Sequence, residues 1–125
     1  MSVLDASAVL ALLQKEPGGG VVASHLDGAR ISTVNASEVG SKLVDAGLTV
    51  GAARATLGAL GIDLVDFDVT QAWAVSSLRS RTRTSGLSLG DRACIALGLH
   101  LDAPVVTADR RWLDFADLVE VIVVR

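Results

Sequence analysis

The sequence predicts an α/β fold in which a parallel sheet lies between helices. Short apolar segments alternate along the chain with longer segments of helical character, a pattern typical of a parallel sheet covered on both faces. Glycine and proline residues separate several of the segments, as expected where helices end. No internal repeat or linker interrupts the pattern, so the 125 residues are expected to form one domain, 1–125.

The first half of the chain is expected to contain strands followed by helices. In chain order, the expected elements are the strand 3–4, the helices 6–14 and 21–26, the strand 30–34, and the helices 36–46 and 50–60. The breaks that end these helices are the segment 17–20, Asp27-Gly28, Gly47 and Gly61. Each break contains glycine, which favours the end of a helix.

The second half is expected to continue the alternation. Its elements are the strand 62–65, the helices 69–81 and 89–101, the strand 105–107, a short helix 110–115 and a last strand 119–124. The polar segment 82–86 separates the two longer helices, and Pro104 precedes the fourth strand. The strands therefore follow one another through crossover segments, as a parallel sheet requires.

Composition indicates a globular protein of a reducing compartment. Hydrophobic residues make up 50% of the chain, but no apolar run approaches the roughly 20 residues of a spanning helix. The N-terminus lacks the basic and apolar regions of a signal peptide. Cys94 is the single cysteine, so it has no intramolecular disulfide partner. We therefore expect a cytoplasmic protein. Its mean hydropathy of +0.50 is high, so some apolar residues are candidates for contacts with partners.

Acidic residues stand where apolar segments give way to expected helix starts. The acidic set consists of Asp5, Glu38, Asp91 and Asp109. Because ligands in parallel α/β folds bind beyond the carboxyl ends of the strands, these acids are expected to meet at one edge of the sheet. No Lys stands beside any of them, so their charges need a cation. Carboxylate oxygens suit a hard divalent metal, and such a site suggests phosphodiester hydrolysis.

Each of these acids also fits a structural role at a helix N-terminus. Asn35-Ala36-Ser37-Glu38 matches a capping box, and Ser88-Leu89-Gly90-Asp91 resembles one. Asp5 and Asp109 suit plain N-caps. Capping and metal binding are compatible, because the positive end of a helix helps keep a carboxylate ionised among other carboxylates. With metal absent, mutual repulsion should raise the pKa of at least one of them.

Arginine residues provide candidate phosphate contacts despite a net charge of −3. Arginine binds phosphate in a bidentate manner more readily than lysine does. The candidates for RNA-phosphate contact are Arg79, Arg81, Arg83, Arg92 and Arg110, and Arg111 also follows one of the acids. The alternative for residues 79–83 is a solvated helix end that complements the helix dipole.

Other catalytic or binding motifs are absent. His25, His100 and Cys94 fit no zinc-ligand spacing. No nucleophile elbow supports a Ser/His/Asp site, and no Gly-Lys-Ser/Thr follows the glycines at 18–20. The aromatic residues Phe67 and Trp73 are expected in the core. Trp112 is expected in the core or an interface, with proximity to RNA as the alternative.

The local sequences around the acidic set resemble the acidic motifs of PIN-domain ribonucleases, and most closely those of VapC-type toxins of bacterial toxin–antitoxin pairs. The resemblance extends over essentially the whole chain, and the segment 86–91 is its most specific part. The matching segments are Val3-Leu4-Asp5-Ala6-Ser7-Ala8, Asn35-Ala36-Ser37-Glu38, Leu87-Ser88-Leu89-Gly90-Asp91-Arg92-Ala93 and Thr107-Ala108-Asp109-Arg110.

This resemblance implies a PIN-like three-layer fold with a central five-stranded parallel sheet. It also implies an endoribonuclease dependent on Mg²⁺ or Mn²⁺, a homodimer, and inhibition by a cognate antitoxin. Carried over by position, the acidic set would bind the metal and be catalytic. Ser7 and Thr107 would place hydroxyl groups near the site, and Asp114 or Asp117 would be an outer member.

Two other functions and one surface stay open at this stage. The chain is alternatively a catalytically weak PIN module that acts mainly by binding a partner or by regulating DNA as a complex, or a structure-specific DNA nuclease on the same fold. The segment 50–60 carries small and apolar residues on most sides, which suits either core burial or a groove or dimer face.

Overall fold

The computed structural model describes residues 1–125 and contains a five-stranded, wholly parallel sheet in the order β3-β2-β1-β4-β5. This confirms the fold class expected from the sequence. The strands are β1 (Val3–Leu4), β2 (Arg30–Ser32), β3 (Asp63–Val65), β4 (Val105–Thr107) and β5 (Val121–Val123). In the central pair, Val3 lies opposite Val105 and Leu4 opposite Val106. That register brings the residues after β1 and β4 to the same edge of the sheet.

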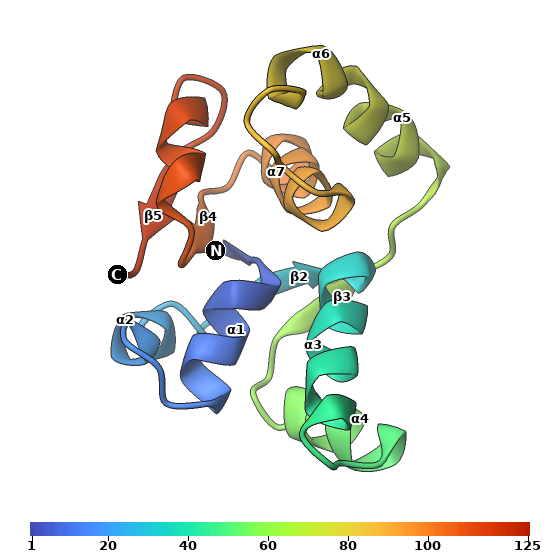
Figure 1. Cartoon of the computed structure of the whole chain (residues 1–125), viewed down its shortest axis with the longest axis vertical. Helices are drawn as coiled ribbons and strands as arrows, with labels where there is room; N and C mark the ends of the chain where they lie inside the picture. Colours follow the sequence, from blue (N-terminus) through green and yellow to red (C-terminus); the bar gives the residue numbers. More distant parts are fainter.

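Helices cover both faces of the sheet (Figure 1). One face carries α1 (Ala6–Leu13), α2 (Gly19–Ala23), α3 (Thr33–Asp45) and α4 (Val50–Gly58). The other face carries α5 (Val69–Ser77), α6 (Arg79–Thr82), α7 (Leu89–Leu101) and the 3-10 helix η1 (Arg110–Phe115). The longest helices have 13 residues, and none has the length and apolar character needed to cross a membrane.

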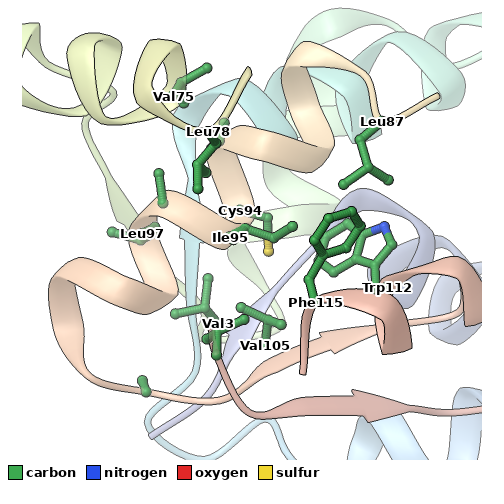
Figure 2. Packing of buried hydrophobic residues seen from close by; sticks show 14 residues of the cluster. Val3, Val75, Leu78, Leu87, Cys94, Ile95, Leu97, Val105, Trp112 and Phe115 are labelled. Carbon is green, nitrogen blue, oxygen red and sulfur yellow. The ribbon is translucent and has the colours of Figure 1, made fainter. Parts of the chain in front are cut away.

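The core consists of two hydrophobic clusters, one on each face of the sheet. Val3 and Val105 belong to the cluster under α7, whereas Leu4 and Val106 belong to the cluster under α1 and α3. This division follows from strand geometry, because successive side chains point to opposite faces. Trp112 is fully buried in the first cluster, where Figure 2 shows it among residues of α7 and η1. Core placement is therefore confirmed for Trp112.

Trp73 was expected in the core, but it is 71% exposed, so that expectation is wrong. Helix α5 instead buries Gln71 and Val75, which lie one turn apart and face α7. Trp73 lies on the outer face of the helix, one turn after the exposed Val69. Phe67 is half-buried and packs against the first cluster.

Several element boundaries also differ from the expectation. Strand β2 ends at Ser32, whose hydroxyl accepts the backbone N–H of Val34 and starts α3 three residues early. The helix expected at 69–81 is divided at Leu78 into α5 and α6. Helix α2 begins at Gly19, within the segment expected only to break a helix, after Gly18 adopts a φ of +93°.

Candidate active site

The fold brings members of the acidic set to the carboxyl edge of the sheet. Asp5 directly follows β1 and is the N-cap of α1. Asp109 follows β4 and is the N-cap of η1. Glu38 lies in the second turn of α3, and Asp91 lies in the first turn of α7. The cap roles of Asp5 and Asp109 suggested by the sequence are thereby confirmed.

Asp5 is buried in a network of hydrogen bonds and is only 4% exposed. Its carboxylate accepts the backbone N–H of Ala8 at 2.8 Å and the Thr107 hydroxyl at 2.6 Å. The Ser7 hydroxyl lies 2.8 and 2.9 Å from the two carboxylate oxygens, and it also accepts the backbone N–H of Ala108 at 2.9 Å. Ser7 and Thr107 therefore fix the Asp5 carboxylate and join β1 to the end of β4.

Burial raises the pKa of Asp5 from 3.8 to about 6. The hydrogen bonds from Thr107, Ala8 and Ser7 oppose this rise, and the charge of Asp91 adds to it. The sequence predicted that one acid would titrate high because of repulsion. The direction is as expected, but desolvation contributes more than the neighbouring carboxylate.

Glu38 is held by Asn35, which is 1% exposed. The Asn35 amide donates to Glu38 Oε1 at 2.8 Å and to the backbone oxygen of Gly90 at 3.0 Å. The capping-box interpretation of residues 35–38 is wrong, because Ser32 caps α3 and Asn35 lies inside the helix. The Asn35 side chain links α3 to the first turn of α7 instead.

Asp91 takes part in the capping box expected at the start of α7. The Ser88 hydroxyl accepts the Asp91 N–H at 3.2 Å, and the Asp91 carboxylate accepts the Ser88 N–H at 2.9 Å. This arrangement confirms the second capping box. It uses one carboxylate oxygen of Asp91 and leaves the other without a hydrogen-bond partner from the protein.

Asp109 is paired with Arg111, so this acid, whose charge was expected to need a metal cation, has a positively charged partner within the chain. The closest Arg111 nitrogen lies 2.6 Å from Asp109 Oδ2, and two further Arg111 contacts reach the carboxylate at 3.1 Å. The hydrogen bond from Arg111 holds the pKa of Asp109 below its ordinary value. The Asp109 backbone N–H donates to Thr107, which connects it to the Asp5 network.

The charges of Asp5, Asp91 and Glu38 all act on the buried thiol of Cys94. Burial raises the pKa of this thiol well above its ordinary value, and the charges of the three acids raise it further. None of the three forms a salt bridge within the chain. Their oxygen atoms are suitable ligands for a hard divalent cation. As the side chains are placed, however, no three His, Cys, Asp or Glu residues converge enough to hold one metal ion.

The candidate phosphate-binding arginines have different environments. Arg81 pairs with Asp117 at 2.6 Å and lies over the Phe115 ring, while Arg92 donates to the backbone oxygen of Val75. Arg110 donates to the backbone oxygen of Arg125. The side chains of Arg79 and Arg83 are exposed and form no hydrogen bond or salt bridge within the chain.

The expected outer residues Asp114 and Asp117 both contact Arg81. The Asp117 carboxylate is paired with Arg81, and its pKa is lowered by that hydrogen bond. Asp114 is exposed, and its backbone oxygen accepts a hydrogen bond from Arg81. No contact joins either side chain to the acidic set.

The sequence reasoning missed Asn35 and Arg111 as members of the site. Asn35 precedes Glu38 by three residues, a spacing that places both side chains on one helix face once α3 is known to start at Thr33. Arg111 follows Asp109 by two residues, but the pairing depends on the tight turn of η1. Of these two, only the spacing of Asn35 and Glu38 could have been read from the local sequence.

A groove lies between α3 and α4, next to the edge strand β3. Its volume is about 760 Å³. Val44, Val50, Leu57 and Leu64 supply apolar lining, and Arg54 and Asp45 supply charge. Val50 is 73% exposed, so the segment 50–60 has both a buried side and an open side.

Comparisons with known proteins agree with this architecture. The model of the family described as PIN domain matches residues 2–118. No curated protein sequence matches the chain significantly. A chain of a toxin–antitoxin complex from Klebsiella pneumoniae is similar in structure, with a TM-score of 0.76 and 17% identity over 100% of this chain and 98% of that one.

Two other solved structures give the same result. VapBC2 from Rickettsia felis, bound to a DNA fragment from its promoter, matches with a TM-score of 0.72 and 14% identity, over 96% of each chain. VapBC-5 from Mycobacterium tuberculosis matches with a TM-score of 0.66 and 24% identity, over 99% of this chain and 97% of that one. At these identities the likeness establishes the fold.

Proposed function

The chain belongs to the PIN-domain family, and on that premise we propose that it is a metal-dependent endoribonuclease, the toxin of a toxin–antitoxin pair. The observation that carries the proposal is the environment of Asp5. This carboxylate is desolvated, fixed by two hydroxyl groups and lies in the field of Asp91, yet no basic side chain pairs with it. A buried anion in that setting is stabilised by a bound cation.

We assign Mg²⁺ or Mn²⁺ to the acidic set, Asp5, Glu38, Asp91 and Asp109. When bound, such a cation supplies positive charge for the phosphodiester transition state and makes water more acidic. The chain itself contributes orientation. Ser7 and Thr107 hold Asp5, Asn35 holds Glu38, and the first turn of α7 presents Asp91.

We assign substrate binding to the arginines at the two ends of α6 and to Arg111 beside the acidic set. Arg79 and Arg83 are free to contact RNA phosphates, whereas Arg81, Arg92 and Arg110 already have partners within the chain. Arg111 lies against Asp109 and is influenced by the charge of Asp91, so it provides a cation close to where a phosphate would bind. Trp73 on α5 is exposed, whereas Trp112 and Phe115 are buried and Phe67 is half-buried, so a single aromatic side chain is fully open to RNA.

We propose the groove between α3 and α4 as the binding surface for the antitoxin, with a homodimer as the toxin's own assembly. The similar structure from Klebsiella pneumoniae is a toxin–antitoxin complex, and the one from Mycobacterium tuberculosis is a member of the VapBC family of toxin–antitoxin systems. An amphipathic segment suits an apolar groove flanked by Arg54 and Asp45. If Leu57→Asp changed neither antitoxin binding nor dimerisation, this surface would be excluded.

The unpaired, buried Cys94 agrees with a cytoplasmic location for the single domain 1–125.

The test is cleavage of total RNA by the purified, partner-free chain with Mg²⁺ or Mn²⁺ and then with a chelator. Discrete fragments that require metal and disappear in Asp91→Asn would support the nuclease. A matched set of single-stranded, duplex and flap DNA substrates separates the proposed activity from that of a DNA nuclease. A folded chain that binds antitoxin but cleaves none of these substrates would favour the catalytically weak module. The catalytically weak module is supported by one observation: the carboxylates of Glu38, Asp91 and Asp109 already have hydrogen-bond or salt-bridge partners within the chain.

A further inference from the structure

The Asn35 side chain has two donors engaged and an acceptor left over. Its Nδ2 group donates to Glu38 Oε1 at 2.8 Å and to the backbone oxygen of Gly90 at 3.0 Å. Its Oδ1 atom is buried without a hydrogen-bond partner. The opposite orientation of the amide would place Oδ1 against two acceptors, so the contacts determine which way the amide points. An orphaned buried acceptor is unfavourable, so the two hydrogen bonds from the amide nitrogen must compensate for it.

Gly90 completes the same arrangement from α7. A β-carbon built on Gly90 would lie under 3.0 Å from both carboxylate oxygens of Glu38. The Glu38 carboxylate therefore occupies the space that any larger residue at position 90 would fill. Because Asp91 is the next residue, the Asn35 contact fixes Glu38 and the first turn of α7 relative to each other.

We propose that Asn35 is a positioning residue that prepares the metal site by fixing Glu38 against Gly90, beside Asp91. This inference rests on the proposed function, because it assigns the purpose of the contact to metal binding. Asn35 donates hydrogen bonds and is not itself a ligand. Without it, the Glu38 side chain gains rotamers, and the bridge between α3 and α7 is lost. Hydrogen-bond partners of metal ligands contribute about 10- to 100-fold to metal affinity.

The experiment measures Mn²⁺ affinity, by electron paramagnetic resonance, for wild type, Asn35→Ala, Glu38→Ala and the double variant. Asn35→Ala should weaken Mn²⁺ binding by about 10- to 100-fold. In the double variant, loss of Asn35 should add little, because its effect passes through Glu38. Gln71→Ala is the matched control. It removes a second buried amide that also has an unpartnered oxygen but does not contact the acidic set, and it should leave the affinity within about twofold, as distant sites act independently.

Gly90→Ala tests the arrangement without removing a hydrogen bond donor. Alanine is the better helix former, and the atoms it meets belong to the end of a flexible side chain, so the helix should persist while Glu38 is displaced. Gly90→Ala should therefore weaken Mn²⁺ binding at an unchanged melting temperature. This variant keeps the inference testable if Asn35→Ala does not fold.

A metal-independent measurement completes the test. In the metal-free protein, the Asn35 side-chain amide hydrogens should exchange slowly with solvent by NMR, and Glu38→Ala should accelerate their exchange. If Glu38→Ala weakens Mn²⁺ binding but Asn35→Ala and Gly90→Ala do not, the positioning role is overturned and the proposed function stands. If wild type binds no Mn²⁺, or Glu38→Ala leaves binding unchanged, the proposed metal site fails and this inference fails with it.

Discussion

The two halves of the candidate site hold their carboxylates in opposite ways. Around β1 and β4, Asp5 is buried, accepts hydrogen bonds from neutral groups and has a raised pKa. At η1, Asp109 lies near the surface and pairs with Arg111, and its pKa is lowered. One acid thus lacks a compensating charge and the other has one within the chain. The difference shows that two carboxylates at the same edge of a sheet can differ in how strongly each favours a bound cation.

The largest expected effect comes from removing the charge of Asp5 or of Asp91, two acids without a basic partner within the chain. Asp5→Asn or Asp91→Asn should lower RNA cleavage by at least about a hundredfold, since a metal ion contributes several kcal/mol to transition-state stabilisation. Asn can retain the cap at either position, so circular dichroism should show an intact fold. Asp68→Asn, which alters an N-cap on α5 away from the site, is the control and should cleave normally. Unchanged cleavage in either site variant would remove that residue from the catalytic assignment.

The raised pKa of Asp5 predicts a stability difference that depends on pH. Between the ordinary pKa of 3.8 and the folded-state value of about 6, the native protein binds more protons at Asp5 than the unfolded chain does. Wild-type stability from this group is therefore fully present below the lower value and falls as pH rises through the higher one. Asp5→Asn avoids that loss.

The quantity to compare is the free energy of unfolding of Asp5→Asn minus that of wild type, in metal-free buffer. This difference should be up to about 3 kcal/mol larger at pH 7.5 than at pH 3.5. Urea denaturation at several pH values measures the difference, and saturating Mg²⁺ should reduce it by stabilising wild type alone. A difference between the two proteins that does not vary with pH would show that Asp5 is not desolvated as described.

Thr107→Val removes the hydrogen bond that partly compensates for burial of Asp5, together with the acceptor of the Asp109 backbone N–H. Valine keeps the shape of threonine but loses the donor at 2.6 Å, so the pKa of Asp5 should rise further and Mn²⁺ affinity should fall about tenfold. Thr82→Val is the matched control, because Thr82 is equally buried and its hydroxyl contacts only the backbone oxygen of Leu78. Equal losses of affinity in both variants would indicate a general packing effect.

The smallest expected effect comes from the Asp109–Arg111 pair at η1. Arg111→Ala removes the cation that pairs with Asp109, so the pKa of Asp109 should return toward its ordinary value. Stability should change by less than about 1 kcal/mol, because this salt bridge is partly exposed and screened by solvent. Mn²⁺ affinity at low salt should increase about two- to threefold, a modest effect expected for a screened surface charge. Calorimetric titration that showed weaker binding would mean that Arg111 supports the metal site instead of competing with it.

The sequence predicted the parallel sheet and the positions of Asp5 and Asp109 after β1 and β4, because both depend on local patterns. Short apolar strands followed by helices determine which residues reach the carboxyl edge, as Asp5 and Asp109 do. The helix start at Ser88 was also visible, since a capping box is a contact between near neighbours in the chain.

The parts that could not be predicted depend on contacts between distant segments. Asn35 looked like an N-cap because its partner at Gly90 is remote in sequence. The exposure of Trp73 depends on which side of α5 packs against α7, and hydrophobicity alone favours burial of a tryptophan. The occupation of Arg81 by Asp117 likewise requires η1 to return beside α6.

The central claim, that the acidic set binds a divalent cation, is tested most directly by crystals of the chain grown with Mn²⁺ and measured for anomalous scattering. The account predicts a peak coordinated by Asp5 together with Asp91 or Glu38, and its loss in crystals of Asp5→Asn. A catalytically active protein with no peak at this edge of the sheet, or with its only peak elsewhere, would contradict the assignment.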